Sequence, residues 1–105
     1  MDRFIVIDAP PEVLDDLKDR LAKESIEYRP FVRKAIGVAE GIAIACSVVN
    51  LAKLIWDWYG SWHARRAGVE VQVTLYPDNI TLKLSPNKRV ELEVLIRPEN
   101  VQNND

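Results

Sequence analysis

The spacing of hydrophobic residues predicts a strand and a short helix at the start of the chain. Residues 4–7 are an apolar, β-rich run, which is typical of a strand that lies between neighbours inside a sheet. Pro10, Pro11 and the acidic residues behind them then favour the start of a helix. Its apolar residues recur at helical spacing, at Val13, Leu14, Leu17 and Leu21. They predict an amphipathic helix with one buried stripe, which ends near Glu24.

Hydrophobic residues alternate with polar ones in the last third of the chain. This period of two over residues 69–76, 80–84 and 90–97 predicts three strands, each with one apolar and one solvated face. Residues 77–79 and 85–88 are rich in proline and asparagine, so they predict turns that join the strands into an antiparallel meander. Pro98 ends the third strand, and we expect the polar residues 99–105 to form a frayed tail.

A long apolar stretch in the middle of the chain is interpreted as one helix, from about residue 31 to about residue 65. Residues 35–59 read AIGVAEGIAIACSVVNLAKLIWDWY. The polar residues Glu40, Ser47, Asn50 and Asp57 are seven, three and seven positions apart, which would place them close to one line along a helix. Lys53 lies near the same line and four residues before Asp57, so we expect the two to pair. The rest of the circumference is apolar and needs to be covered.

These elements predict one α+β domain over residues 1–98. Their order is a strand, a short helix, the long helix and three strands. We therefore expect a four-stranded, mostly antiparallel sheet with the short amphipathic helix and the long apolar helix packed on one face. A length of 105 residues suits a single domain.

The residue content offers little material for a catalytic or metal centre. The composition, 48% hydrophobic and 29% charged, is globular, and a net charge of −2 lacks the basic footprint of a nucleic-acid-binding protein. The chain has one cysteine, Cys46, which we interpret as a small buried hydrophobic residue, and one histidine, His63, seventeen positions later. They are poor material for a Cys–His pair or a metal site, and no phosphate-binding glycine loop is present. We expect no enzyme, no metal, no cofactor and no nucleic-acid partner. The start lacks a secretory pattern, so we expect a cytoplasmic protein.

The predicted long helix suggests a function in binding. One sheet and one short helix would leave part of it uncovered, and a second copy, a partner protein or a membrane could cover the remainder. Gly37 and Gly41 would let another backbone approach closely, although packing against the domain's own sheet would use the same pattern. The predicted interaction surface comprises Gly37, Glu40, Gly41, Ile44, Val48, Leu51, Ile55, Trp58 and Trp62.

The same residues leave a membrane-associated function open as an alternative. Residues 35–62 are long enough to cross a bilayer, and tryptophans followed by Arg65 and Arg66 at their end are typical of an interfacial anchor. Glu40 and Lys53 would each cost about 2.5 to 3.5 kcal/mol at the centre of a spanning helix, which argues against a lone span. The helix could instead lie on the bilayer, with Arg65 and Arg66 on anionic headgroups. Cations at these two positions also simply favour a helix C-terminus.

Three stretches together resemble a known family. They are IAIACSVVNLAKLIWDWYGSWHARR, VEVQV at residues 69–73 and RVELE at residues 89–93. In this order, behind a leading strand and helix, they resemble the effector-associated constant component proteins of bacterial conflict systems. The resemblance extends over nearly the whole chain and carries no catalytic motif. It implies a non-enzymatic adaptor in defence, which forms a homo-oligomer or docks an effector protein through the long helix.

Overall fold

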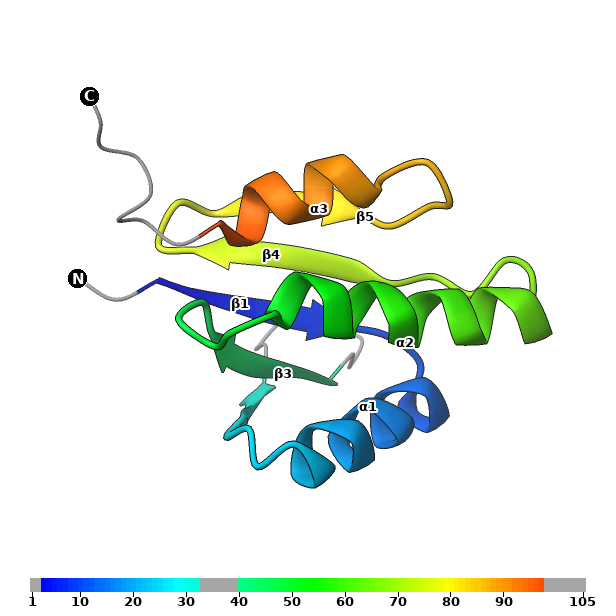
Figure 1. Ribbon diagram of the computed structural model, residues 1–105, viewed down its shortest axis with the longest axis horizontal. Coiled ribbons are helices and arrows are strands. Elements are labelled where there is room, and N and C mark those ends of the chain that lie inside the picture. The colour runs from blue at the N-terminus through cyan, green and yellow to red at the C-terminus, as the bar shows by residue number, and fades with distance from the viewer. Residues whose placement is uncertain (1–2, 33–39, 98–105) are drawn as a thin grey trace.

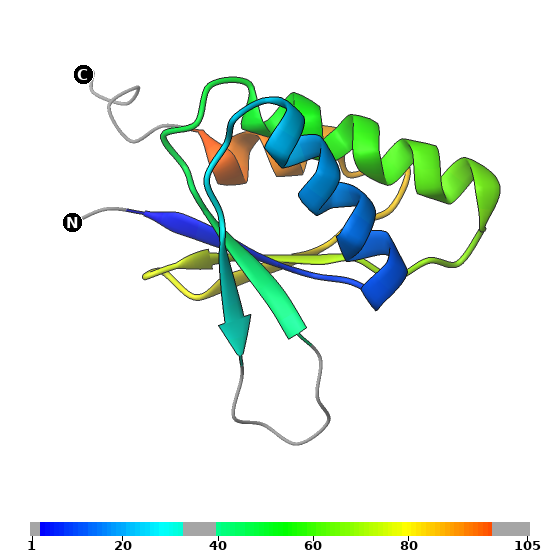
Figure 2. The same ribbon diagram turned by 90° about the horizontal axis from the view of Figure 1, so that it is seen from below.

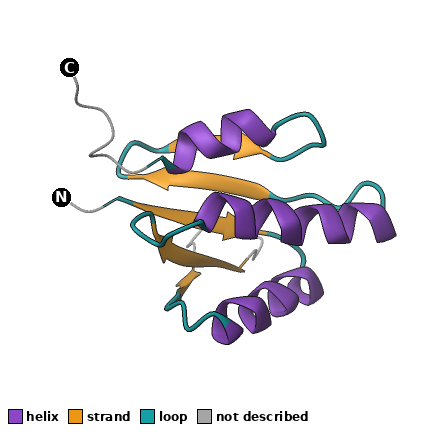
Figure 3. Ribbon diagram, in the orientation of Figure 1, coloured by secondary structure: helices purple, strands orange, loops and turns teal. Residues whose placement is uncertain are grey.

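The described part of the chain forms two layers, a five-stranded sheet and three helices that lie on one of its faces (Figures 1 and 2). The computed structural model describes residues 3–32 and 40–97. The predicted α+β class, with an antiparallel sheet that the helices cover on one side, is confirmed (Figure 3). The elements in chain order are β1 (Phe4–Asp8), α1 (Pro11–Lys23), β2 (Arg29–Val32), β3 (Glu40–Ala45), α2 (Leu51–Arg65), β4 (Gln72–Tyr76), β5 (Ile80–Lys83) and α3 (Arg89–Ile96).

β1 lies at the centre of the sheet, whose strand order is β2-β3-β1-β4-β5 with antiparallel neighbours throughout. Ile5 and Ile7 belong to the core under the helices, and Val6 between them points to the other face. All three side chains are completely buried. The prediction of a first strand between two neighbours is therefore confirmed, and so is the helix that follows, whose four stripe residues are all buried.

The prediction of one long helix over residues 31–65 is wrong. Residues 29–32 and 40–45 are strands, and the helix begins only at Leu51, behind Asn50 in a left-handed conformation with φ 61°. Ile42 and Ile44 pair with Ile7 and Ile5 of β1 and enter the core. The small residues that alternate with them, at positions 41, 43 and 45, lie on the opposite face. Large and small residues alternate with period two here, which suits a strand. Residues 33–39 lie outside the described part.

The third strand of the predicted meander is also wrong, because residues 89–96 form helix α3. Its core contacts are made by Leu92 and Ile96, which are four residues apart and both buried. The other two strands, β4 and β5, and the turn at residues 77–79 are confirmed. The sheet thus has five strands instead of four, because β2 and β3 are gained and the predicted third strand of the meander is lost to α3. The predicted tail at residues 99–105 lies outside the described residues.

An aromatic cluster lies on the face of the sheet opposite the helices. Phe4 and Tyr76 face each other across β1 and β4, with ring centroids 5.3 Å apart. Phe31 of β2 reaches the same cluster, 5.6 Å from the Tyr76 ring. This contact joins the β2–β3 hairpin, which bends away from the helices in Figure 2, to the centre of the sheet. The second face is thereby packed by aromatic contacts between strands.

Two glycines provide a matched test of this fold. A Cβ atom on Gly41 would lie 2.7 Å from the Asp8 carboxylate and 3.0 Å from the backbone oxygen of Ile7, whereas one on Gly60 in α2 would meet nothing within 4 Å. We predict that Gly41→Ala lowers the free energy of unfolding by about 1 to 3 kcal/mol. Gly60→Ala should raise it by about 0.5 to 1 kcal/mol, because alanine favours a helix interior. Urea denaturation measures both, and a neutral Gly41→Ala would contradict the strand register at this position.

Candidate functional site

The structure does not gather the predicted interaction residues on one exposed surface. Residues predicted to line the helix lie instead in the domain core: Ile44, Leu51, Ile55 and Trp58 are at most 1% exposed. Gly41 is buried in β3, while Val48 and Trp62 are partly buried against the core. Gly37 and the side chain of Glu40 lie outside the described part. The prediction that these residues form one continuous helical surface is therefore wrong for the described members of the set.

The two arginines at the end of α2 contact other residues of the protein. Both terminal nitrogens of Arg66 donate to Glu12 Oε2 of α1, at 2.8 and 2.9 Å. The guanidinium group of Arg65 lies over the Trp62 ring, 4.3 Å from its centroid. The hydrogen bonds from Arg66 hold the pKa of Glu12 below its usual value. Arg66 thus ties the end of α2 to the first turn of α1 in addition to complementing the helix C-terminus.

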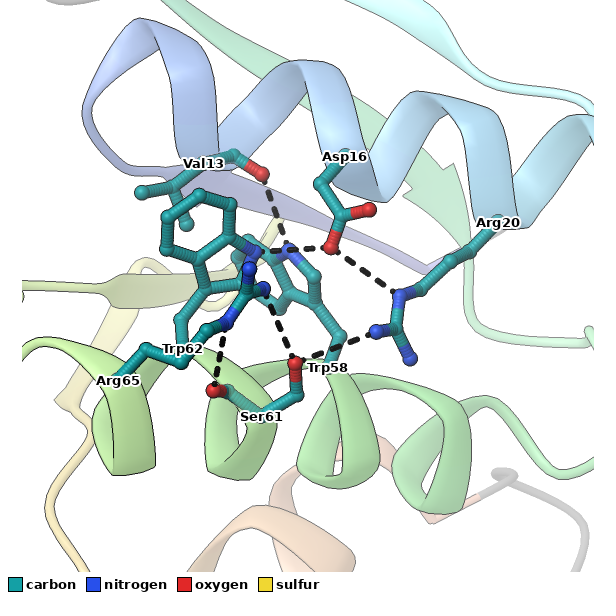
Figure 4. Close-up of polar contacts among 7 residues, drawn as sticks. All are labelled: Val13, Asp16, Arg20, Trp58, Ser61, Trp62 and Arg65. Carbon is teal, nitrogen blue, oxygen red and sulfur yellow. Dashed lines mark hydrogen bonds and ion pairs between the residues drawn. The ribbon is translucent and has the colours of Figure 1, made fainter.

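Helices α1 and α2 run in opposite directions, and a line of polar contacts joins their facing sides (Figure 4). The Trp58 indole nitrogen donates to the Val13 carbonyl oxygen at 3.0 Å. The Trp62 indole nitrogen donates to Asp16 Oδ2 at 2.8 Å. These two bonds lie on successive turns of each helix and fix the position of α1 along α2. Both tryptophans belong to the stretch predicted to be one long helix, but their acceptors, more than forty residues away in the chain, could not be identified from the sequence.

The same line of contacts extends to Arg20. The Asp16 carboxylate accepts a further hydrogen bond from Arg20 Nε at 3.2 Å, and Arg20 Nη2 donates to Ser61 Oγ at 3.4 Å. The Arg20 side chain is only about one-third exposed. An arginine held from two helices has few alternative positions, so its guanidinium group is oriented by the fold.

Beyond Arg20, where α1 ends and α2 begins, the two helices border a groove of about 340 Å³. Its lining comes from two separate parts of the chain, residues 20–26 and 49–57. The lining residues are Arg20, Lys23, Glu24, Ile26, Val49, Asn50, Lys53, Leu54 and Asp57. Lys53 and Asp57 form the predicted ion pair, at 2.9 Å. The other contributors were not anticipated.

The groove combines apolar and positively charged surface. Ile26 and Leu54 are partly buried, and Val49 is 80% exposed, which is unusual for a large aliphatic side chain. Lys23 has no ion pair among the described residues. The first turn of α2 has neither a side-chain cap nor an acidic residue, so the partial positive charge of its N-terminus is not offset there. Glu24 is the acidic lining residue without an ion pair in the described part.

The cysteine, the histidine and the acidic side chains of the described residues form no metal centre. No three histidine, cysteine, aspartate or glutamate side chains among them could hold a metal ion. Cys46 is buried as predicted, and burial raises the pKa of its thiol. His63 stacks on Tyr59 with ring centroids 5.6 Å apart. In the described part of the chain, no helix has both the length and the apolar character needed to cross a membrane.

Comparison of the chain with protein-family models, curated proteins and solved structures gives no match.

The Glu12–Arg66 pair predicts a specific pH dependence. Because the folded-state pKa of Glu12 is lowered, its contribution to stability is present above the unfolded-state pKa and is lost as pH falls through the folded-state pKa. We predict that Glu12→Gln is less stable than the wild type at neutral pH and equally stable in acid. Thermal unfolding between acidic and neutral pH measures the difference in stability between the variant and the wild type. Glu27→Gln, at an exposed position without an ion pair in the described part, is the control. A loss of stability in Glu12→Gln that is the same at every pH would contradict a stabilising pair between ionised Glu12 and Arg66.

Proposed function

We propose that this chain is a non-enzymatic protein-interaction module that holds a short segment of a partner protein in the groove between α1 and α2. The observation that carries the proposal is the convergence on one concave site of aliphatic side chains, a lysine without an ion pair in the described part of the chain and an uncapped helix N-terminus. Binding sites of this size are concave, with apolar walls and a few placed polar groups. The residues that line it come from elements whose relative position is fixed by buried contacts.

The fixed geometry supports binding because a preformed site loses little freedom when it is occupied. Trp58 and Trp62 tie α1 to α2, and Asp16 orients Arg20 at the groove wall. The groove therefore exists before a partner arrives. It needs no rearrangement of the core to accept a chain segment.

The lining favours a segment that carries an aliphatic side chain next to a carboxylate. Ile26, Leu54 and Val49 offer apolar surface to the aliphatic group. Lys23 and the N-terminus of α2 attract a negative charge. Arg20 and Lys53 are already paired with acids of the protein, so they add hydrogen-bond donors more than net charge. Glu24, at the rim of the groove, repels a bound carboxylate, so we expect the affinity to be moderate.

The resemblance to components of bacterial conflict systems agrees with an adaptor of this kind. In that setting the segment held in the groove would belong to an effector protein. The alternative of a membrane-associated component depended on a continuous helix over residues 35–62. Since residues 40–45 form strand β3 and helix α2 begins only at Leu51, the proposal rests on the groove instead.

A pair of blocked tripeptides tests the proposal. Acetyl-Leu-Glu-Leu-amide should shift the backbone amide signals of residues 50–54 and 23–26 in ¹H–¹⁵N spectra of the labelled protein. Acetyl-Leu-Gln-Leu-amide, which lacks the charge, should shift the same signals with weaker affinity. No shifts at these residues, or equal affinity for both peptides, would contradict the proposed chemistry.

Matched charge variants locate the effect in the groove. Lys23→Glu should weaken binding of the acidic peptide, and Glu24→Gln should strengthen it, each by about two- to fivefold, as expected for exposed charges. Val49→Ser should weaken binding by removing apolar surface from the rim without adding charge. Val94→Ser, an equivalent substitution on α3, is the control and should leave the affinity unchanged. A Val94→Ser effect equal to that of Val49→Ser would place binding elsewhere.

A further inference from the structure

One edge of the molecule carries most of the large apolar side chains that the described residues leave exposed. There are four such side chains, Val49 at 80%, Val90 at 66%, Val94 at 54% and Ile80 at 50%. Val49 belongs to the groove, whereas the other three lie on β5 and α3. Both elements lie at the same side of the domain, where β5 is the last strand of the sheet and α3 covers it (Figure 1). This edge is separate from the groove.

Helix α3 has apolar side chains on two opposite sides. Leu92 and Ile96 face the core, while Val90 and Val94, one helical turn apart, face outwards. A surface helix normally has one apolar stripe. Ile80 continues the outward apolar strip on the sheet, because it pairs with the core residue Leu75 and so lies on the helical side. The strip therefore belongs to the helical layer at the β5 edge.

The backbone of β5 is also open on this side. Among the described strands it pairs only with β4. The Leu84 amide donates to the Val71 carbonyl at 2.9 Å, so Leu84 and, by alternation, Leu82 point their backbone groups inwards. Thr81 and Lys83 consequently present their N–H and C=O groups to the free edge. The opposite edge differs, because β2 contains Pro30, which has no N–H to donate.

We propose that a second copy of this chain docks at this edge, with β5 beside β5 and α3 beside α3 across a two-fold axis. An antiparallel pair of identical strands is self-complementary, and side chains that face each other must lie on the same face of the joined sheet. In the register that we propose, the outward backbone groups pair and Thr81 lies opposite the same threonine of the second copy. Val90 and Val94 of the two copies then cover each other above the joint.

Charge favours the same arrangement. In this register Lys83 of one copy lies opposite Asn79 of the other and beside its neighbour Asp78. Among the residues that the structure describes, Lys83 has one ion pair, a distant one with Glu70 at 3.9 Å. The positive end of one β5 strand thus meets the negative turn that precedes the other. Because the β2 edge is interrupted by proline, pairing closes at two copies instead of extending into a fibre.

Light scattering with size-exclusion chromatography tests this inference on the full chain. The wild type should have the mass of a dimer, in a concentration-dependent equilibrium. The double substitution Val90→Lys and Val94→Lys should raise the dissociation constant at least about tenfold, equivalent to 1.4 kcal/mol. Val49→Lys, at the most exposed of these valines, is the matched control and should remain a dimer. A monomeric wild type at the concentrations used for NMR would overturn the proposal.

Two further experiments test the proposal if the lysine variant fails to fold: a backbone variant and a hydrogen-exchange measurement on the wild type. Thr81→Pro removes an outward N–H without breaking a backbone hydrogen bond to β4, so it should also give monomers. The substitution also removes the 3.2 Å hydrogen bond between the Thr81 and Thr74 hydroxyl groups. In the wild type, the amide protons of Thr81 and Lys83 should exchange more slowly as protein concentration rises. A dimer that survives both substitutions, or exchange at these two amides that is independent of concentration, would overturn the assignment of this edge.

Discussion

The hydrogen bond from the Trp58 indole to the Val13 carbonyl oxygen determines how the helical layer is assembled. The indole is completely buried, and an indole N–H buried without an acceptor would cost about 1 to 3 kcal/mol. Its acceptor is a backbone atom in the first turn of α1, 3.0 Å away. This requirement fixes where α1 lies along α2. The second tryptophan bond, to Asp16, and the orientation of Arg20 follow from that placement.

The elements that were predicted correctly are those whose local sequence pattern fits one kind of element only. β1, α1, β4 and β5 have short, regular patterns bounded by prolines or turns. The prediction of a helix failed at residues 40–50, because alanine, glycine, isoleucine and valine there fit a helix and a strand almost equally well, whereas residues 51–65 are helical as predicted. In EGIAIA the alternation of isoleucine with small residues was the available signal for β3, and Ser47 and Asn50 marked the break before α2. The pairing partner that decides the outcome, β1, lies about forty residues away in the sequence.

The error at α3 has a different cause. RVELEVLI alternates with period two, yet Leu92 and Ile96 also match the spacing of one helical turn. Packing against α2 and the last strands buries these two residues in one stripe, and this long-range contact cannot be inferred from the local pattern.

The groove could not be predicted for a similar reason, because its walls come from two separate parts of the chain, residues 20–26 and 49–57. Only the Lys53–Asp57 pair, four residues apart on one helix, was available from the sequence. The two surfaces that we propose for binding, the groove and the edge formed by β5 and α3, lie on separate parts of the domain.

Hydrogen exchange of the Trp58 indole proton tests most directly whether the contact between α1 and α2 holds the helical layer together. This proton should exchange only through global unfolding, so that its exchange free energy equals the free energy of unfolding measured in urea. The indole proton of the partly exposed Trp56 serves as the internal reference for fast exchange. Exchange of the Trp58 proton at a rate close to that of the Trp56 proton would contradict the claim that this contact holds the helical layer together. It would mean that α1 leaves α2 in the native state and that the groove has no fixed shape.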